Sequence, residues 1–144
     1  MKSIGLYPRV RADTIGPGVV SQARGAALAE AVRAAGLDMA LSSALSRWRK
    51  PLARHDPGKV ICDLAVALAL GGDCLADVAL PRAEPAVFGP IASDPTVSRT
   101  IDALAADLKR ALAAIDTARA AARSGCRGWP DRTPRIMAST SRRH

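Results

Sequence analysis

Apolar residues recur at every third or fourth position along most of the chain, and this spacing is typical of amphipathic helices. It predicts a first helix over residues 22–35, with Gly36 as a typical C-terminal stop. A second helix is expected over residues 39–48, with Asp38 at its N-cap and Pro51 beyond its end. Regular structure therefore begins as two helices separated by a glycine.

The clearest helix start along the chain is Asp56-Pro57, because Asp is a favoured N-cap and proline suits the first helical position. The run VICDLAVALAL that follows is apolar almost all round, so its helix is expected at the buried centre. Asp73 is then expected to cap a short helix, CLADVAL, which Pro81 ends.

One apolar stripe continues through the last third of the chain. It predicts a single long helix over residues 95–123, straight or bent, with Asp94 at the N-cap and Pro95 in the first turn. The stripe consists of Val97, Ile101, Leu104, Leu108, Leu112, Ile115, Ala118 and Ala122.

The two ends of the chain lack this helical spacing. Residues 1–18 form an extended N-terminal segment in which residues 10–15 could be a short strand. Residues 124–144 hold two prolines and five arginines without apolar spacing, which predicts a disordered tail. The fold is therefore expected to be mainly α, a helical bundle over residues 19–123 with a helix-turn-helix-like unit.

Composition and charge narrow the class of protein. Hydrophobic residues make up 49% of the 144 positions but only 3% are aromatic, which indicates a core of small aliphatic side chains. No apolar run is long enough to cross a bilayer, and the three cysteines form no paired motif, so we expect a soluble cytoplasmic protein that avoids membranes. The net charge of +8 favours nucleic acid as a partner.

Two groups of residues are candidates for DNA contacts. The helix-turn-helix-like unit leaves Thr96, Ser98 and Arg99 in the N-terminal turn of its second helix, where hydroxyls and an arginine suit phosphate and base-edge contacts. An ordinary capped helix in a bundle explains the same pattern. The second group, around Trp48, could grip a phosphate backbone or complement a helix dipole. It consists of Arg47, Arg49, Lys50 and Arg54.

The sequence offers little for catalysis. His55 stands next to Asp56, but neighbouring residues at a helix cap point in different directions, and Asp56 is already expected to act as the cap. The sequence contains no phosphate-binding glycine loop and no zinc-hydrolase or serine-hydrolase motif. No catalytic residue, metal ligand or cofactor is therefore assigned to this chain.

Three stretches carry a resemblance to a known family: WRKPLARHDPGKV, LALGGDCLAD and FGPIASDPTVSRTID. With their surroundings, over residues 4–123, they resemble the N-terminal region of bacterial insertion-sequence transposases of family thirteen-eighty, within the group 1 DDE transposases. Arg24, where a small residue is expected, and Pro81 depart from the pattern.

The resemblance implies a longer protein whose RNase H-like domain binds divalent metal, Mg²⁺, through three carboxylates to cut and join DNA. In that pattern the first catalytic Asp follows the long helix, so this chain is expected to be a truncated, inactive fragment that binds the ends of the element. Back-translated from the third base of the Gly128 codon, GWPDRTPRIMAST can read LAGPHAPDHGVD, which resembles the family and indicates a frameshift near residues 124–127.

Two alternative functions stay open at the level of sequence. The chain could be a small basic DNA-binding regulator that uses its arginine-rich tail as a phosphate-binding arm. It could also be a helical interaction module, a homodimer joined through the stripe that contains Leu108. Both alternatives predict the same mainly α fold.

Overall fold

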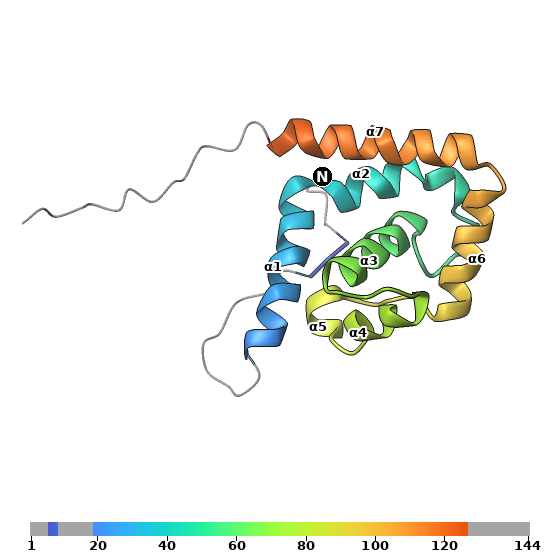
Figure 1. The fold of residues 1–144 in the computed structure, drawn as a ribbon. Coiled ribbons are helices and arrows are strands. Elements are labelled where there is room, and N and C mark those ends of the chain that lie inside the picture. The colour runs from blue at the N-terminus through green and yellow to red at the C-terminus, as the bar shows by residue number, and fades with distance from the viewer. Residues whose placement is uncertain (1–5, 9–18, 127–144) are drawn as a thin grey trace, which may run out of the picture.

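The computed structural model describes residues 6–8 and 19–126, and these residues form helices and connections without a strand. The prediction of a mainly α fold is confirmed. Figure 1 shows α3 at the centre, framed by α1, α2, α6, α7 and the short helices α4 and α5. The elements are α1 (Val19–Ala35), α2 (Leu37–Ala44), η1 (Ser46–Trp48), α3 (Pro57–Ala69), η2 (Leu75–Val78), α4 (Ala79–Arg82), α5 (Pro85–Phe88), α6 (Asp94–Ala105) and α7 (Leu108–Cys126).

The predicted start and burial of α3 are confirmed. The side chain of Asp56 accepts a hydrogen bond from the backbone N–H of Lys59 at 3.1 Å, and Pro57 occupies the first turn. Val60, Cys62 and Val66 are almost inaccessible to solvent. A Cβ on Gly58 would collide with the backbone at Ser42, so this glycine lets α2 and α3 approach closely.

Three other predicted N-caps are wrong. Asp38 lies inside the first turn of α2, because Gly36, with φ of 69°, ends α1 and starts α2 directly. The residue at the N-cap of η2 is Cys74 and not Asp73. Ser93 precedes α6, so Asp94 is its first helical residue. Asp94 instead accepts a 2.7 Å hydrogen bond from the guanidinium of Arg82, which ties α4 to the start of α6.

The sequence suggested that Pro81 ends the short helix before it, and this prediction is wrong. It lies inside α4, which runs to Arg82, and its side chain is fully buried. A proline is tolerated here because α4 is a single turn, where few backbone N–H groups have an intrahelical partner.

The predicted single helix over residues 95–123 is also wrong, because the chain turns a corner after Ala105. The N–H of Asp107 bonds to the carbonyl of Leu104, and α7 then runs along α2, as Figure 1 shows. Val97 and Leu104 are buried on α6, whereas α7 buries Ala111, Ala118 and Ala122. Leu108 and Leu112 of the predicted stripe remain more than half exposed.

A buried polar cluster attaches the N-terminal residues to the helices. The hydroxyl of Tyr7 donates to Asp63 at 2.6 Å, and Lys59 Nζ donates to both oxygens of Asp63 at 3.0 and 2.9 Å. The backbone N–H of Leu6 donates to Asp38 at 2.8 Å. These contacts explain the burial of Asp63, whereas Asp38 has a partner for Oδ2 but none for its buried Oδ1 among the described residues.

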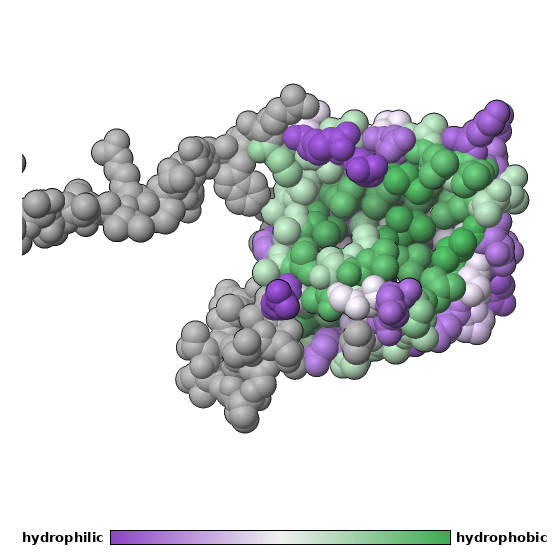
Figure 2. Space-filling view, in the orientation of Figure 1, coloured by the Kyte–Doolittle hydropathy of each residue, from purple (hydrophilic) through white to green (hydrophobic). Residues whose placement is uncertain are grey.

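Hydrophobic residues also reach the surface. Figure 2 shows them gathered across the centre of the viewed face, over the position of α3 in Figure 1. Among the described residues, the large apolar side chains that are exposed are Leu52, Leu68, Leu75, Leu108 and Leu112. The predicted segment at residues 10–15 and residues 127–144 of the predicted tail lie outside the described residues, whereas Ser124–Cys126 belong to α7.

Candidate nucleic-acid interface

The two predicted DNA-contact groups meet at one open hollow on the surface. One wall is the connection between η1 and α3 together with the residues at its two ends, and the other is the face of α6 that runs from Thr96 to Ala103. The hollow measures about 350 Å³. Its lining residues are Trp48, Arg49, Lys50, Ala53, Arg54, His55, Pro57, Thr96, Arg99, Thr100 and Ala103. We call this hollow the basic groove, because four of its lining side chains are arginine or lysine.

Arg49 is the best-anchored cation of the basic groove. Its Nη1 lies 3.3 Å from Oδ2 of the buried Asp56, while about half of the Arg49 side chain stays exposed. The same carboxylate oxygen accepts a 2.7 Å hydrogen bond from Ser42 on α2. Asp56 therefore caps α3 and also holds Arg49 against the wall of the groove.

Three further cations carry charge that the fold does not neutralise. Lys50, Arg54 and Arg99 are exposed, and none of them forms an ion pair with a carboxylate among residues 6–8 and 19–126. Arg99 donates to the Thr96 hydroxyl at 3.4 Å, and Thr96 also contacts Ser93 at 3.0 Å. A cluster of unpaired cations next to hydroxyls is an arrangement that attracts phosphate.

Two of the predicted contact residues lie outside the groove lining. The guanidinium of Arg47 lies 5.4 Å from the centroid of the Trp48 ring, where a cation–π contact holds it beside the groove. Ser98 is half-buried on α6 and is not part of the lining. The sequence interpretation also omitted Thr100, whose position one turn after Thr96 could have indicated it.

The groove wall contains a strained turn. Residues 50–53 form a tight turn closed by a 3.1 Å hydrogen bond from the N–H of Ala53 to the carbonyl of Lys50. Leu52 has φ of 61°, which places a γ-branched side chain in the left-handed region. This conformation costs an L-residue roughly 1–2 kcal/mol. No sequence signal distinguished Leu52 from an ordinary surface leucine.

The pKa of His55 is lower than that of a free imidazole. Partial burial lowers its pKa, and the neighbouring charges of Arg54 and Lys59 lower it further, although Asp63 acts in the opposite direction. The imidazole is therefore neutral at physiological pH. Because Asp56 is committed to Ser42, Arg49 and the backbone of Lys59, its carboxylate is unavailable as a partner in acid-base chemistry.

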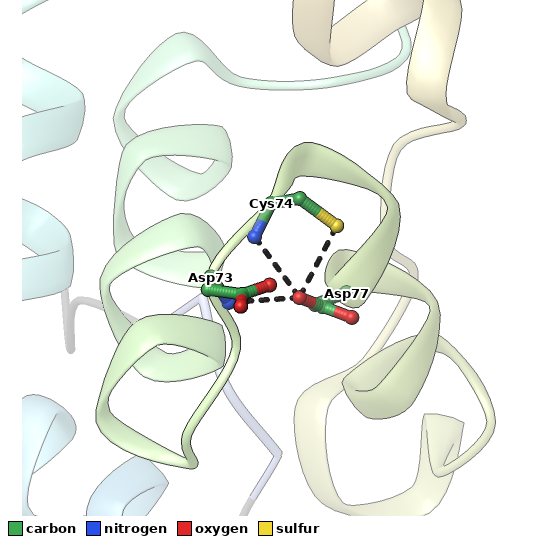
Figure 3. Close-up of side chains that lie close together, drawn as sticks. All are labelled: Asp73, Cys74 and Asp77. Carbon is green, nitrogen blue, oxygen red and sulfur yellow. Dashed lines mark hydrogen bonds between the residues drawn. The ribbon is translucent and has the colours of Figure 1, made fainter.

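A separate group of side chains resembles a metal site but does not fit one. Figure 3 shows Asp73, Cys74 and Asp77 side by side at the start of η2. Oδ2 of Asp77 accepts hydrogen bonds from the N–H groups of Asp73 and Cys74, and these bonds lower the pKa of Asp77. A thiol is a poor ligand for Mg²⁺, and the best-placed carboxylate oxygen is already occupied, so we assign this cluster to helix capping.

The described residues form a mainly α fold with a basic groove on its surface. A family model described as transposase DDE domain group 1 matches residues 2–124, which is most of the chain. The chain therefore belongs to this family of DDE transposases. No curated protein and no solved structure matches it. Within residues 6–8 and 19–126, no helix combines the length and apolar character needed to cross a bilayer.

The family match confirms the resemblance at the level of the transposase family. It also implies a metal-dependent DNA transposase as the parent activity, and DNA as the class of partner. The assignment of Thr96, Ser98, Arg99, Arg47, Arg49, Lys50 and Arg54 to DNA contacts remains a prediction. The predicted homodimer also remains a prediction.

Proposed function

We propose that the helical body is the DNA-binding module of an insertion-sequence transposase, and that its basic groove holds the phosphate backbone at the ends of the element. The observation that carries this proposal is the convergence of a cationic segment, residues 49–54, with the part of α6 that contains Arg99 and two threonines. The two are far apart in sequence but line the same hollow. A family of DNA transposases supplies the partner that such a groove would suit.

The electrostatics of the groove support phosphate as the bound group. Lys50, Arg54 and Arg99 leave about three positive charges unpaired around one hollow, and the pKa of His55 is lowered in part by Arg54. Each phosphate contact releases a condensed counterion, so binding through three such cations is strongly salt-dependent. Thr96 adds a hydroxyl that can donate to a phosphate oxygen.

A charge-matched pair of variants tests this proposal. The groove variant carries Lys50→Ala, Arg54→Ala and Arg99→Ala, and the control carries Lys109→Ala, Arg119→Ala and Arg123→Ala. The three control residues are exposed on α7, away from the groove, and their loss lowers the net charge by the same amount.

Binding is measured by fluorescence anisotropy with a labelled duplex taken from the DNA that flanks the coding sequence. The groove variant is expected to lose affinity on the order of 100-fold at 0.1 M salt, because three phosphate contacts are removed. The control should lose only the small, non-local part of the attraction. Equal losses in the two variants would show that binding depends on net charge and not on the groove.

We further propose that residues 19–123 contribute DNA binding and not strand cleavage. The described residues include one cluster of three metal-ligating types, and its chemistry does not fit Mg²⁺. The purified chain is therefore expected to leave an element-end duplex uncut in the presence of Mg²⁺ or Mn²⁺. Metal-dependent nicking that persists through repurification would eliminate this proposal.

The residues after position 124 differ in composition from the helical body. The family match ends at residue 124, where the composition changes to proline and arginine without apolar spacing. We assign this tail to translation of a shifted reading frame of a family-thirteen-eighty element. Sequencing the coding DNA tests this directly, since another frame must continue as LAGPHAPDHGVD from the Gly128 codon.

A further inference from the structure

The least expected residue beside the basic groove is Leu52. Its side chain is fully exposed, at 104% of the reference accessibility, and its backbone is in the left-handed region with φ of 61°. Each feature is unfavourable for a leucine, because one leaves an apolar side chain in water and the other strains the backbone. Glycine or asparagine would fit this turn position better.

The fold does not explain why a leucine occupies this position. Pro51 at the preceding position, positive φ at Leu52 and the hydrogen bond from Ala53 to Lys50 are the arrangement of a type II turn. A side chain that is fully exposed makes no packing contact that would stabilise the chain. Strain that packing does not require is commonly found at functional sites.

The positive charges on both sides of Leu52 indicate that its binding partner is a polyanion. Lys50 lies two residues before it and Arg54 two residues after it, and both line the basic groove. Leu52 is not part of the groove lining but stands on the turn between these two cations, so a polyanion that spans them would pass beside the exposed leucine. A single leucine is a small apolar contact for a membrane or for a protein, and the transposase family makes DNA the polyanion that these cations would meet.

We propose that Leu52 is an apolar wedge that enters a groove of duplex DNA and inserts at a base step, while Lys50 and Arg54 hold the flanking phosphates. Leucine is among the side chains that proteins use to unstack and kink a duplex in this way. The turn presents it at a fixed angle, so little conformational freedom is lost on insertion. Flexible pyrimidine–purine steps are the preferred sites. This inference rests on the proposed DNA-binding function.

Leu52→Ala isolates the contribution of the side chain. Since Leu52 makes no packing contact, and alanine is strained by positive φ much as leucine is, the variant should unfold at the same denaturant concentration as the wild type. Its affinity for duplex DNA should fall about tenfold, because the apolar contact with the bases is lost. The control is Leu112→Ala, which makes the same truncation at a half-exposed leucine on α7, outside the groove.

Two further readouts separate a wedge from a phosphate contact. The slope of log K against log salt should be unchanged in Leu52→Ala, whereas Lys50→Ala should reduce its magnitude by about 0.9. A wedge also bends the duplex that it enters, and Leu52→Ala should lose this DNA bending. The bend is measured by energy transfer between dyes at the two ends of a 30-base-pair duplex.

The outcomes distinguish this inference from the proposed function. If Leu52→Ala binds and bends DNA like the wild type while the triple groove variant binds weakly, the wedge is wrong and the groove stands. If the wild-type chain does not bind duplex DNA, both proposals fail. The wedge is supported if affinity and bending fall together in Leu52→Ala at constant salt slope, with Leu112→Ala unaffected.

Discussion

Replacing Asp63 by asparagine should destabilise the chain strongly, because it breaks a buried ion pair on one side. The side chains of Lys59 and Asp63 are only 9% and 3% exposed, and Lys59 Nζ contacts both carboxylate oxygens within 3.0 Å. In Asp63→Asn the ammonium group remains buried without a counter-charge. The hydroxyl of Tyr7 also loses a charged acceptor at 2.6 Å.

The expected magnitude follows from these contacts. Removing one partner of a buried ion pair costs about 3–5 kcal/mol, and the amide oxygen of asparagine can still accept one hydrogen bond, so we expect about 3 kcal/mol. Domains of this size are stable by only about 5–15 kcal/mol. The variant should therefore lose a large part of its stability, and its Tm should fall by roughly 6–12 °C.

The assay is urea denaturation followed by helical circular dichroism. A triple variant, Tyr7→Phe with Lys59→Met and Asp63→Leu, should recover most of the lost stability, because it removes both charges together with the buried hydroxyl that would otherwise lack an acceptor. The exposed pair on α7 provides the control, since Asp116→Asn should change the free energy of unfolding by less than about 0.5 kcal/mol. If Asp63→Asn destabilises the chain no more than Asp116→Asn does, the buried Lys59–Asp63 pair does not stabilise the fold.

Three further results are expected. Asp56→Ala should lose about 1–2 kcal/mol of stability in urea denaturation, and Asp56→Asn should recover only part of this loss, because asparagine can still cap α3 but its amide nitrogen cannot accept from Ser42 and Arg49. In native protein a thiol reagent should modify the exposed Cys74 and Cys126 quickly and reach Cys62 only on unfolding, since burial raises the pKa of the Cys62 thiol to about 12. DNA affinity should rise as the pH falls below neutral, because a bound phosphate raises the lowered pKa of His55 and binding then takes up a proton, and a His55→Gln variant should lose this dependence.

The sequence predicted the helical character of the chain and its strongest local signal, but three of the four predicted N-caps are displaced by one or two residues. The start of α3 at Asp56-Pro57 is visible because capping and proline preferences act within one turn. The corner between α6 and α7 is not visible, since Leu104, Leu108 and Leu112 keep a spacing of four residues through the break. The corner depends instead on α7 burying alanines such as Ala111, which is a tertiary effect.

The candidate site also combines features that are visible in the sequence with features that depend on tertiary packing. Cations at residues 47–54 and a capped helix start near Thr96 could each be recognised in the sequence. Their meeting at one groove depends on how η1, α3 and α6 pack, and no local pattern encodes that. Leu52 was missed because its strained backbone appears only once the turn at residues 50–53 is known.

The central claim is that the basic groove contacts phosphate, and the salt dependence of DNA binding tests it most directly. The slope of log K against log salt is measured for the wild type and for the variant with Lys50→Ala, Arg54→Ala and Arg99→Ala. Loss of three phosphate contacts predicts a decrease of about 2.7 in the magnitude of this slope. An unchanged slope would contradict the claim, since the three cations would then make no contact with the DNA backbone.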